Sequence, residues 1–127
     1  PTFGQNFVNV LANSTTYNST TTYVNKATLS TGTVPAGTYR IGWSFGRNHP
    51  TVTTDILVRV QIDNTTDLMT LREEPAEVAS QRQYCGGFTY STFGVSGAHT
   101  YDIDFSVESA GTTASMFDTG LEFWRVS

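Results

Sequence analysis

Apolar and polar side chains alternate with a period of two along three stretches of this chain. In the stretch TYRIGWSFG, residues 38–46, the alternating apolar positions are Tyr39, Ile41, Trp43 and Phe45. The stretches DILVRVQID (55–63) and AHTYDIDFSV (98–107) repeat the pattern. Because successive side chains of a β-strand point to opposite faces, this alternation predicts three strands that each bury one face.

Shorter segments of the same kind lie around these stretches, and we count eight or nine strands at intervals of about 8–14 residues. Residues 72–83 break the pattern and are expected to form a loop with at most one or two helical turns. The spacing predicts an all-β fold, an antiparallel β-sandwich of jelly-roll type. An immunoglobulin-type sandwich is the alternative, but the chain has one cysteine and so lacks the usual cysteine pair.

The 127 residues are expected to form a single domain. Residues 1–22 are predicted to be an N-terminal arm, or an edge strand with a threonine-rich loop, because residues 13–22 read NSTTYNSTTT. Residues 23–127 are predicted to form the jelly-roll domain.

The chain ends on GLEFWRVS, a strand with large apolar side chains on both faces. Leu121 and Phe123 share one face, and Trp124 and Val126 share the other. A sandwich strand is normally apolar on its inner face and polar on its outer face. We therefore predict that Trp124 and Val126, with Phe93 from another strand, form an interface between copies of this chain. The alternative is that these side chains lie beneath a loop of their own subunit.

The charge of the chain argues against two classes of partner. The net charge is −4, Lys26 is the only lysine, and the seven basic residues form no run. Nucleic acids and anionic membrane surfaces bind clustered Lys and Arg, so we expect neither as a partner. No apolar run approaches the roughly 20 residues that span a bilayer. The start at Pro1 fits removal of an initiator methionine and assembly in a cytoplasm, although a trimmed precursor would look the same.

Three groups of residues are candidates for chemistry. Asp102 and Asp104 share one face of a strand, but a solvated strand face explains them better than an acid–base pair or a calcium site. Ser96 and His99 lie close in sequence without the strand–elbow–helix context of a hydrolase. We therefore expect no catalytic residues, no cofactor and no metal ion. Carbohydrate binding stays open, because flat tyrosine rings suit sugar stacking; the candidates are Tyr17, Tyr23, Tyr84 and Tyr90.

Four strand sequences together resemble small β-sandwich proteins of tailed bacteriophage virions. They are AGTYRIGWSF, LMTLREEP, AHTYDIDF and LEFWRV, and the resemblance covers residues 36–126. It implies a jelly-roll module, commonly a trimer, that is used on the capsid surface or in tail fibres. Trimeric jelly rolls of the tumour-necrosis-factor type similarly bury aromatic side chains of terminal strands at their three-fold axis. No catalytic residues come with this resemblance.

We therefore expect a non-enzymatic virion protein, a capsid decoration or cement protein that binds and stabilises the phage shell as a homo-oligomer. Its expected partners are further copies of itself and the major capsid protein. The alternative is a tail-fibre or receptor-binding domain that recognises a host-surface carbohydrate. The predicted contacts with the shell are made by four arginines, which are Arg40, Arg47, Arg72 and Arg82. A free-standing domain without a shaft favours the decoration role.

Overall fold

The computed structural model describes residues 4–74 and 82–127. Within them the chain forms nine strands and no helix. The strands are β1 (Val8–Ala12), β2 (Thr16–Asn18), β3 (Val24–Val34), β4 (Gly37–Asn48), β5 (Ile56–Ile62), β6 (Thr66–Glu73), β7 (Gln83–Phe93), β8 (Gly97–Val107) and β9 (Ala114–Arg125).

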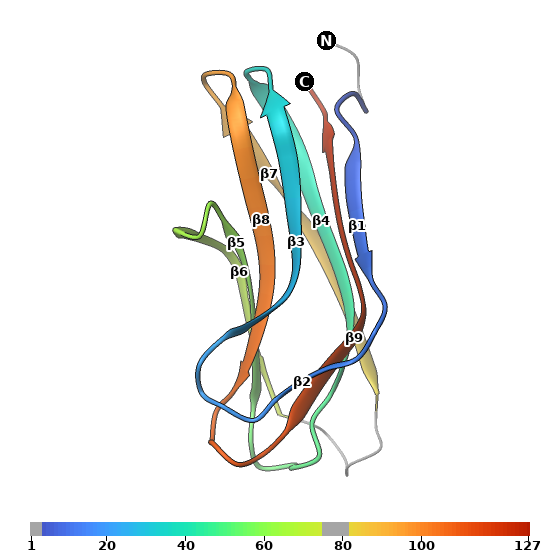
Figure 1. The fold of residues 1–127 in the computed structure, drawn as a ribbon, viewed down its shortest axis with the longest axis vertical. Coiled ribbons are helices and arrows are strands. Elements are labelled where there is room, and N and C mark those ends of the chain that lie inside the picture. The colour runs from blue at the N-terminus through green and yellow to red at the C-terminus, as the bar shows by residue number, and fades with distance from the viewer. Residues whose placement is uncertain (1–3, 75–81) are drawn as a thin grey trace.

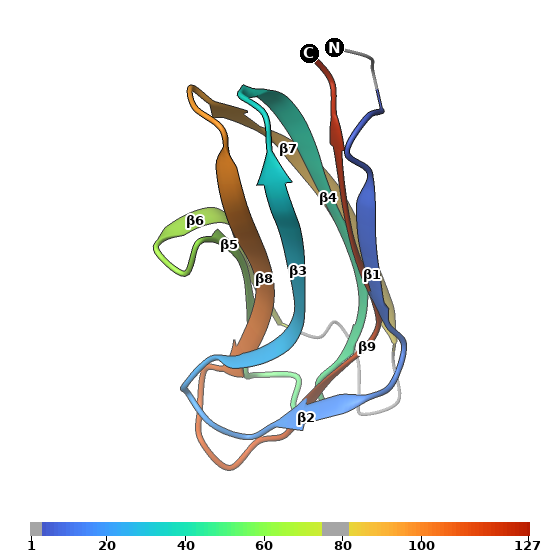
Figure 2. The same cartoon turned by 45° about the horizontal axis from the view of Figure 1, so that its top comes forward.

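The strands form two antiparallel sheets that pack face to face (Figures 1 and 2). Sheet A has the order β1-β9-β4-β7, with β2 also paired to β9, and sheet B has the order β3-β8-β5-β6. Between β3 and β9 the chain changes sheet at every step except β5 to β6, which is the interleaving of a jelly roll. The predicted all-β antiparallel sandwich is confirmed.

The core lies between the sheets and contains the side chains that the alternation placed inward. Ile41 and Phe45 of β4, and Val58 and Val60 of β5, are at most 1% exposed. Phe123 joins the layers through two other buried rings. Its ring stacks on Tyr39 of the neighbouring strand at 4.7 Å between centroids, and it meets Tyr101 of sheet B at 5.6 Å.

Two strand boundaries differ from those that the sequence suggests. The segments ASMFD (114–118) and GLEFWRV (120–126) suggest two strands, but one strand, β9, covers most of both. Asp118 takes a positive φ of 48°, and the pairing with β4 shifts register there. The segment STGTVPAG (30–37) predicts a turn, but the turn is shorter, because β3 continues to Val34 through two irregularities in its pairing with β8. Of the predicted loop at 72–83, residues 75–81 lie outside the described residues.

The N-terminal residues of the described chain lie at one edge of sheet A. β1 pairs with the C-terminal half of β9, from Val8 opposite Phe123 to Ala12 opposite Thr119. β2 pairs with the beginning of β9, in the threonine-rich segment. The terminal strand β9 is therefore an interior strand of its sheet, with β1 and β2 on one side and β4 on the other.

Candidate functional site

The outer face of sheet A, which is turned away from sheet B, carries a group of exposed apolar side chains. Their exposed fractions are 57% for Phe7, 68% for Leu11, 52% for Phe88 and 56% for Tyr90. They come from strands that are far apart in sequence, and the pairing of the strands brings them together. For example, Arg40 of β4 lies opposite both Trp124 of β9 and Tyr90 of β7.

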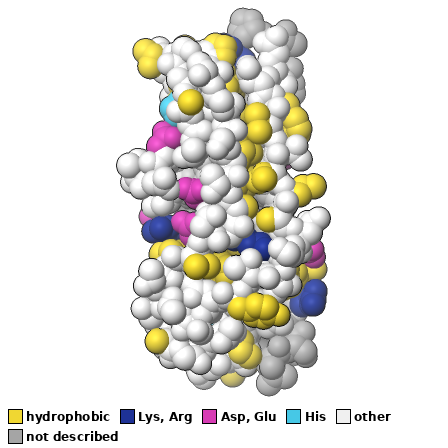
Figure 3. All heavy atoms as spheres, viewed as in Figure 1, with side chains coloured by type: hydrophobic (Ala, Val, Ile, Leu, Met, Phe, Trp, Pro, Cys, Tyr) yellow, Lys and Arg dark blue, Asp and Glu magenta, His cyan; other side chains and the backbone are white. Residues whose placement is uncertain are grey.

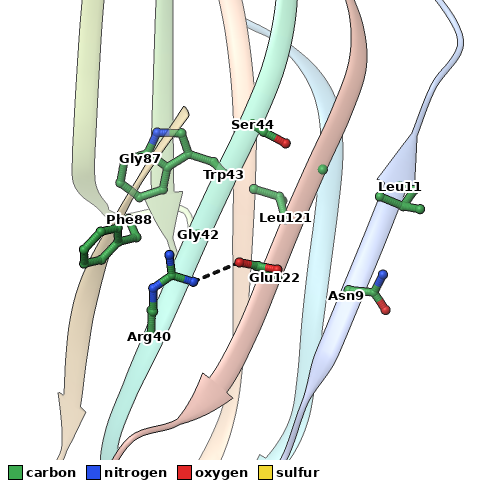
Figure 4. Close-up of a pocket in the computed structure, with 11 residues that line it drawn as sticks. Asn9, Leu11, Arg40, Gly42, Trp43, Ser44, Gly87, Phe88, Leu121 and Glu122 are labelled. Atoms are coloured by element: carbon green, nitrogen blue, oxygen red, sulfur yellow. Dashed lines mark hydrogen bonds and ion pairs between the residues drawn. The ribbon is translucent and has the colours of Figure 1, made fainter. Parts of the chain in front are cut away.

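A hollow of about 300 Å³ opens on this face (Figure 4). Gly42, Ser44 and Gly120 form its floor, where the absence of large side chains leaves the space. Gly120 lies directly opposite Ser44 in the register of β9 and β4. The side chains around the floor are Asn9, Leu11, Arg40, Trp43, Phe88 and Glu122. We call this feature the glycine hollow.

Arg40 is fixed beside the glycine hollow by three contacts. Its Nη1 donates a hydrogen bond of 2.8 Å to Oε1 of Glu122, which forms an ion pair. Its guanidinium carbon lies 4.3 Å from the ring centroid of Phe88 and 4.6 Å from that of Trp124. A planar guanidinium stacks well on aromatic faces, so Arg40 bridges the rings of β7 and β9. The cation and Glu122 leave this part of the face with no net charge.

The three predicted interface residues do not form one patch. Trp124 points to the outer face, as expected, and its own chain half-covers it because Phe7 stacks on its ring at 6.1 Å. Its indole Nε1 is buried, and no residue in the described part of the chain forms a hydrogen bond with it. Val126 follows β9, and its backbone N–H donates to the Thr38 carbonyl. Phe93 instead packs against the core and stacks on His99 at 3.8 Å.

The four predicted shell-contact arginines are in four different settings. Arg40 lies beside the glycine hollow, and Arg47 is 1% exposed, where it contacts Glu73 and Gln83. Arg72 is exposed and pairs with carboxylates of Asp55 and Glu108, which raise the pKa of its guanidinium. Arg82 is exposed, and its guanidinium lies 4.5 Å from the ring centroid of Phe117. Their role in shell contact stays a prediction.

The outer face of sheet B is polar, and Figure 3 shows acidic side chains over β8. Asp102 and Asp104 do point outward, but they are only 7% and 6% exposed. The expectation of a solvated strand face was therefore wrong, because neighbouring side chains cover both carboxylates. Asn25 and Arg59 donate hydrogen bonds of 3.0 Å to Asp104, and the Thr28 hydroxyl donates to Asp102.

Of the two residues that lie close in sequence, Ser96 and His99, the histidine is held by a carboxylate. His99 Nδ1 lies 2.8 Å from Asp63 Oδ2, and this contact and the Thr100 N–H lower the pKa of Asp63 against a burial effect in the other direction. Ser96 is exposed in the turn between β7 and β8.

Among residues 4–74 and 82–127, no three His, Cys, Asp or Glu side chains are placed to hold a metal ion. The same residues contain no helix that is long and apolar enough to cross a membrane.

The sequence contained only a partial signal for this site. The alternation of β9 placed Trp124 and Glu122 on one face, but the partners of these residues are separated from them by long stretches of chain. Arg40 and Glu122 are 82 positions apart. The alternate positions of β7 also indicated that Phe88 and Tyr90 share a face. Only the strand register shows that this face is the one with the glycine hollow.

Comparison with known proteins identifies the fold class. No protein-family description matches the sequence, and no curated protein is found to be related to it. The globular domain of zebrafish complement 1qA protein superposes with a TM-score of 0.56 at 10% identity, over 95% of this chain and 97% of that one. The VP2 subviral particle protein of infectious bursal disease virus gives 0.55 at 7% identity, over 95% of this chain and 37% of that one.

A third likeness is to a family GH115 glucuronidase, with a TM-score of 0.52 at 12% identity over 89% of this chain and 14% of the enzyme. The chain thus spans only about a third of the viral protein and a smaller part of the enzyme. These likenesses place the protein in the jelly-roll class of β-sandwiches. At such low identity they establish the fold alone.

Proposed function

We propose that this protein is a non-enzymatic structural component of a virion. More specifically, it is a capsid decoration protein that stabilises a phage shell. It assembles in the host cytoplasm and forms a homo-oligomer with trimeric symmetry. The strand sequences that resemble phage virion proteins support this role, as does the shared fold of a viral protein that forms subviral particles.

The observation that carries the proposal is the contrast between the two outer faces of the sandwich. Sheet A exposes aromatic and aliphatic side chains from β1 and β7 around a neutral ion pair, whereas sheet B exposes polar and charged ones. Exposed apolar side chains that are grouped on one face and lie beside polar groups are typical of contact surfaces. A structural protein that functions by repeated contact needs such a surface.

The test is binding of the purified protein to shells. Shells of the source virus, in expanded and unexpanded form, are mixed with the protein and separated on a density gradient. Saturable co-sedimentation with the expanded shell, and a higher melting temperature of that shell, are expected. Light scattering of the free protein should give an oligomer that Trp124→Ala dissociates. A monomer that binds neither form of the shell would refute the proposal.

A second candidate function is recognition of a host-surface carbohydrate by a tail-fibre or receptor-binding module. The observation in its favour is a polar hollow of about 350 Å³ on sheet B. Carboxylate, amide and hydroxyl groups, which are the usual partners of sugar hydroxyls, line it; they belong to Asn25, Thr28, Asn64, Thr100, Asp102 and Asp104. A glycan array with the wild-type protein and an Asn64→Ala variant tests this function, and a blank array counts against it.

A further inference from the structure

Two glycines on the outer face of sheet A, Gly42 and Gly120, are not required by the backbone conformation of the single chain. Gly42 and Gly120 lie inside long strands, and neither has a positive φ. A Cβ at Gly120 would meet the side-chain ends of Leu11 at 3.3 Å and Ser44 at 3.4 Å. At Gly42 it would meet the carboxylate of Glu122 at 3.1 Å. The backbone conformation requires glycine at neither position. A Cβ at Gly120 would meet side-chain ends that can shift, whereas a Cβ at Gly42 would press on the ion pair, with Glu122 Cγ at 3.2 Å and Arg40 Nη1 at 3.3 Å.

Glycine in a strand interior weakens the strand and often marks a place where another backbone or a ligand comes close. Gly42 and Gly120 form the floor of the glycine hollow, together with the small Ser44. The hollow is therefore suited to a large side chain that enters from outside the subunit. Its surroundings are neutral as a whole, since Arg40 is paired with Glu122.

The chain carries a complementary feature on β7. This edge strand has 11 residues with no proline and no charged side chain. Its alternate side chains Tyr84, Phe88 and Tyr90 are 63%, 52% and 56% exposed. Natural proteins usually protect long edge strands with charges, prolines or a covering segment. One of the two edge strands of sheet B, β6, follows this rule because it contains Asp67, Arg72 and Glu73.

We propose that the outer face of sheet A binds a second copy of this chain, with an aromatic side chain of the partner's β7 in the glycine hollow. The proposal rests on the self-assembly in the proposed function and identifies the surface that carries it. A second copy fits because an uncharged aromatic strand matches a neutral hollow without introducing an unpaired charge. An aromatic side chain buries about 150–250 Å² and has the geometry to stack on a flat glycine floor.

The ion pair beside the hollow makes this contact specific. In the single subunit the side chains of Arg40 and Glu122 are 23% and 43% exposed, so water still screens them. A second copy over this face removes that water. Loss of one partner then leaves the other charge buried and uncompensated, which is far more costly than loss of the whole pair. We expect Glu122→Gln to weaken association at least about 100-fold, and Arg40→Met with Glu122→Leu to restore most of it.

The experiment measures the dissociation constant by sedimentation equilibrium for the wild type and four variants. Ser44→Trp fills the hollow from an exposed position and should weaken association at least about 100-fold, because anchor residues in interface pockets carry most of the binding energy. Thr70→Trp is the matched control, since Thr70 is exposed on β6 of sheet B. Denaturant melts of each variant at low protein concentration verify that the subunits are folded.

The outcomes separate this proposal from the proposed function. An oligomer that Ser44→Trp weakens and Thr70→Trp leaves intact supports the proposal. An oligomer that tolerates Ser44→Trp and Glu122→Gln overturns it but leaves virion assembly standing through another surface. A wild-type protein that is monomeric at millimolar concentration overturns this proposal, and shell binding then decides the proposed function independently. Equal weakening by Ser44→Trp and Thr70→Trp also overturns it.

Discussion

Replacement of Phe123 by alanine should remove a large part of the stability of this protein. Phe123 is 0% exposed, and it is the ring through which β9 contacts Tyr39 of its own sheet and Tyr101 of the opposite sheet. Phe→Ala substitutions in packed cores cost about 3–5 kcal/mol, because transfer energy is lost and a cavity is left. The stack on Tyr39, with 4.7 Å between centroids and 7° between planes, is lost as well, and we expect a loss of about 4 kcal/mol.

Urea unfolding followed by tryptophan fluorescence measures this loss. A domain of this size unfolds with a free energy of about 5–15 kcal/mol. With a slope of about 2 kcal/mol/M, a loss of about 4 kcal/mol lowers the midpoint by about 2 M. Tyr17→Ala is the matched control, because Tyr17 is an aromatic residue that is 68% exposed, and it should change stability by less than about 1 kcal/mol. A loss below about 1.5 kcal/mol for Phe123→Ala would refute the view that this ring joins the sheets.

Three further substitutions test other parts of the structure. Burial lowers the pKa of His49 in the folded protein. As the pH falls through about 6.5, the unfolded chain therefore gains a proton that the folded chain does not, and the free energy of unfolding falls. Urea melts across this pH range should show a flatter pH dependence for His49→Asn. Burial raises the pKa of Tyr101 to about 12, so the free energy of unfolding should decline as the pH rises from 10 to 12. Tyr101→Phe should abolish that decline. At neutral pH the same substitution should cost about 1 kcal/mol, because the hydrogen bond to Ser91 is lost. In Gly46→Ala the new Cβ would collide with a ring carbon of Phe117, so a thermal melt should show a loss of about 1–3 kcal/mol. An unchanged melting temperature would contradict this packing.

The inner layer of the fold could be predicted from the sequence because its signal is local. The alternation within a single strand indicates which of its faces is buried. Ile41, Val58 and Ile103 could therefore be placed in the core without knowledge of their partner strands. Strand boundaries were less accessible, since they depend on irregularities that alternation does not encode. The positive φ of Asp118 lets β9 run through a position where the sequence suggested a break.

The outer layer could not be predicted in the same way, because it depends on register between distant strands. In the sequence, Asp102 and Asp104 have the pattern of the solvent-exposed face of an amphipathic strand. In the structure, Arg59 and Asn25 from the neighbouring strands cover this face and donate hydrogen bonds to it. Trp124 was correctly assigned to the outer face. What covers one side of it is Phe7, from a segment whose sequence suggested only an arm or an edge.

The four arginines that were predicted to contact a shell differ in whether their charge can still pair with a partner. If a second copy covers the outer face of sheet A, Arg40 is used in that contact, and Arg47 is already buried. Arg72 is neutralised by two carboxylates of its own chain. Arg82 has no ion pair among the described residues and stacks only on Phe117, so its charge is available to an acidic surface. Of the four arginines predicted to contact a shell, Arg82 is therefore the one whose removal should weaken shell binding without affecting self-association.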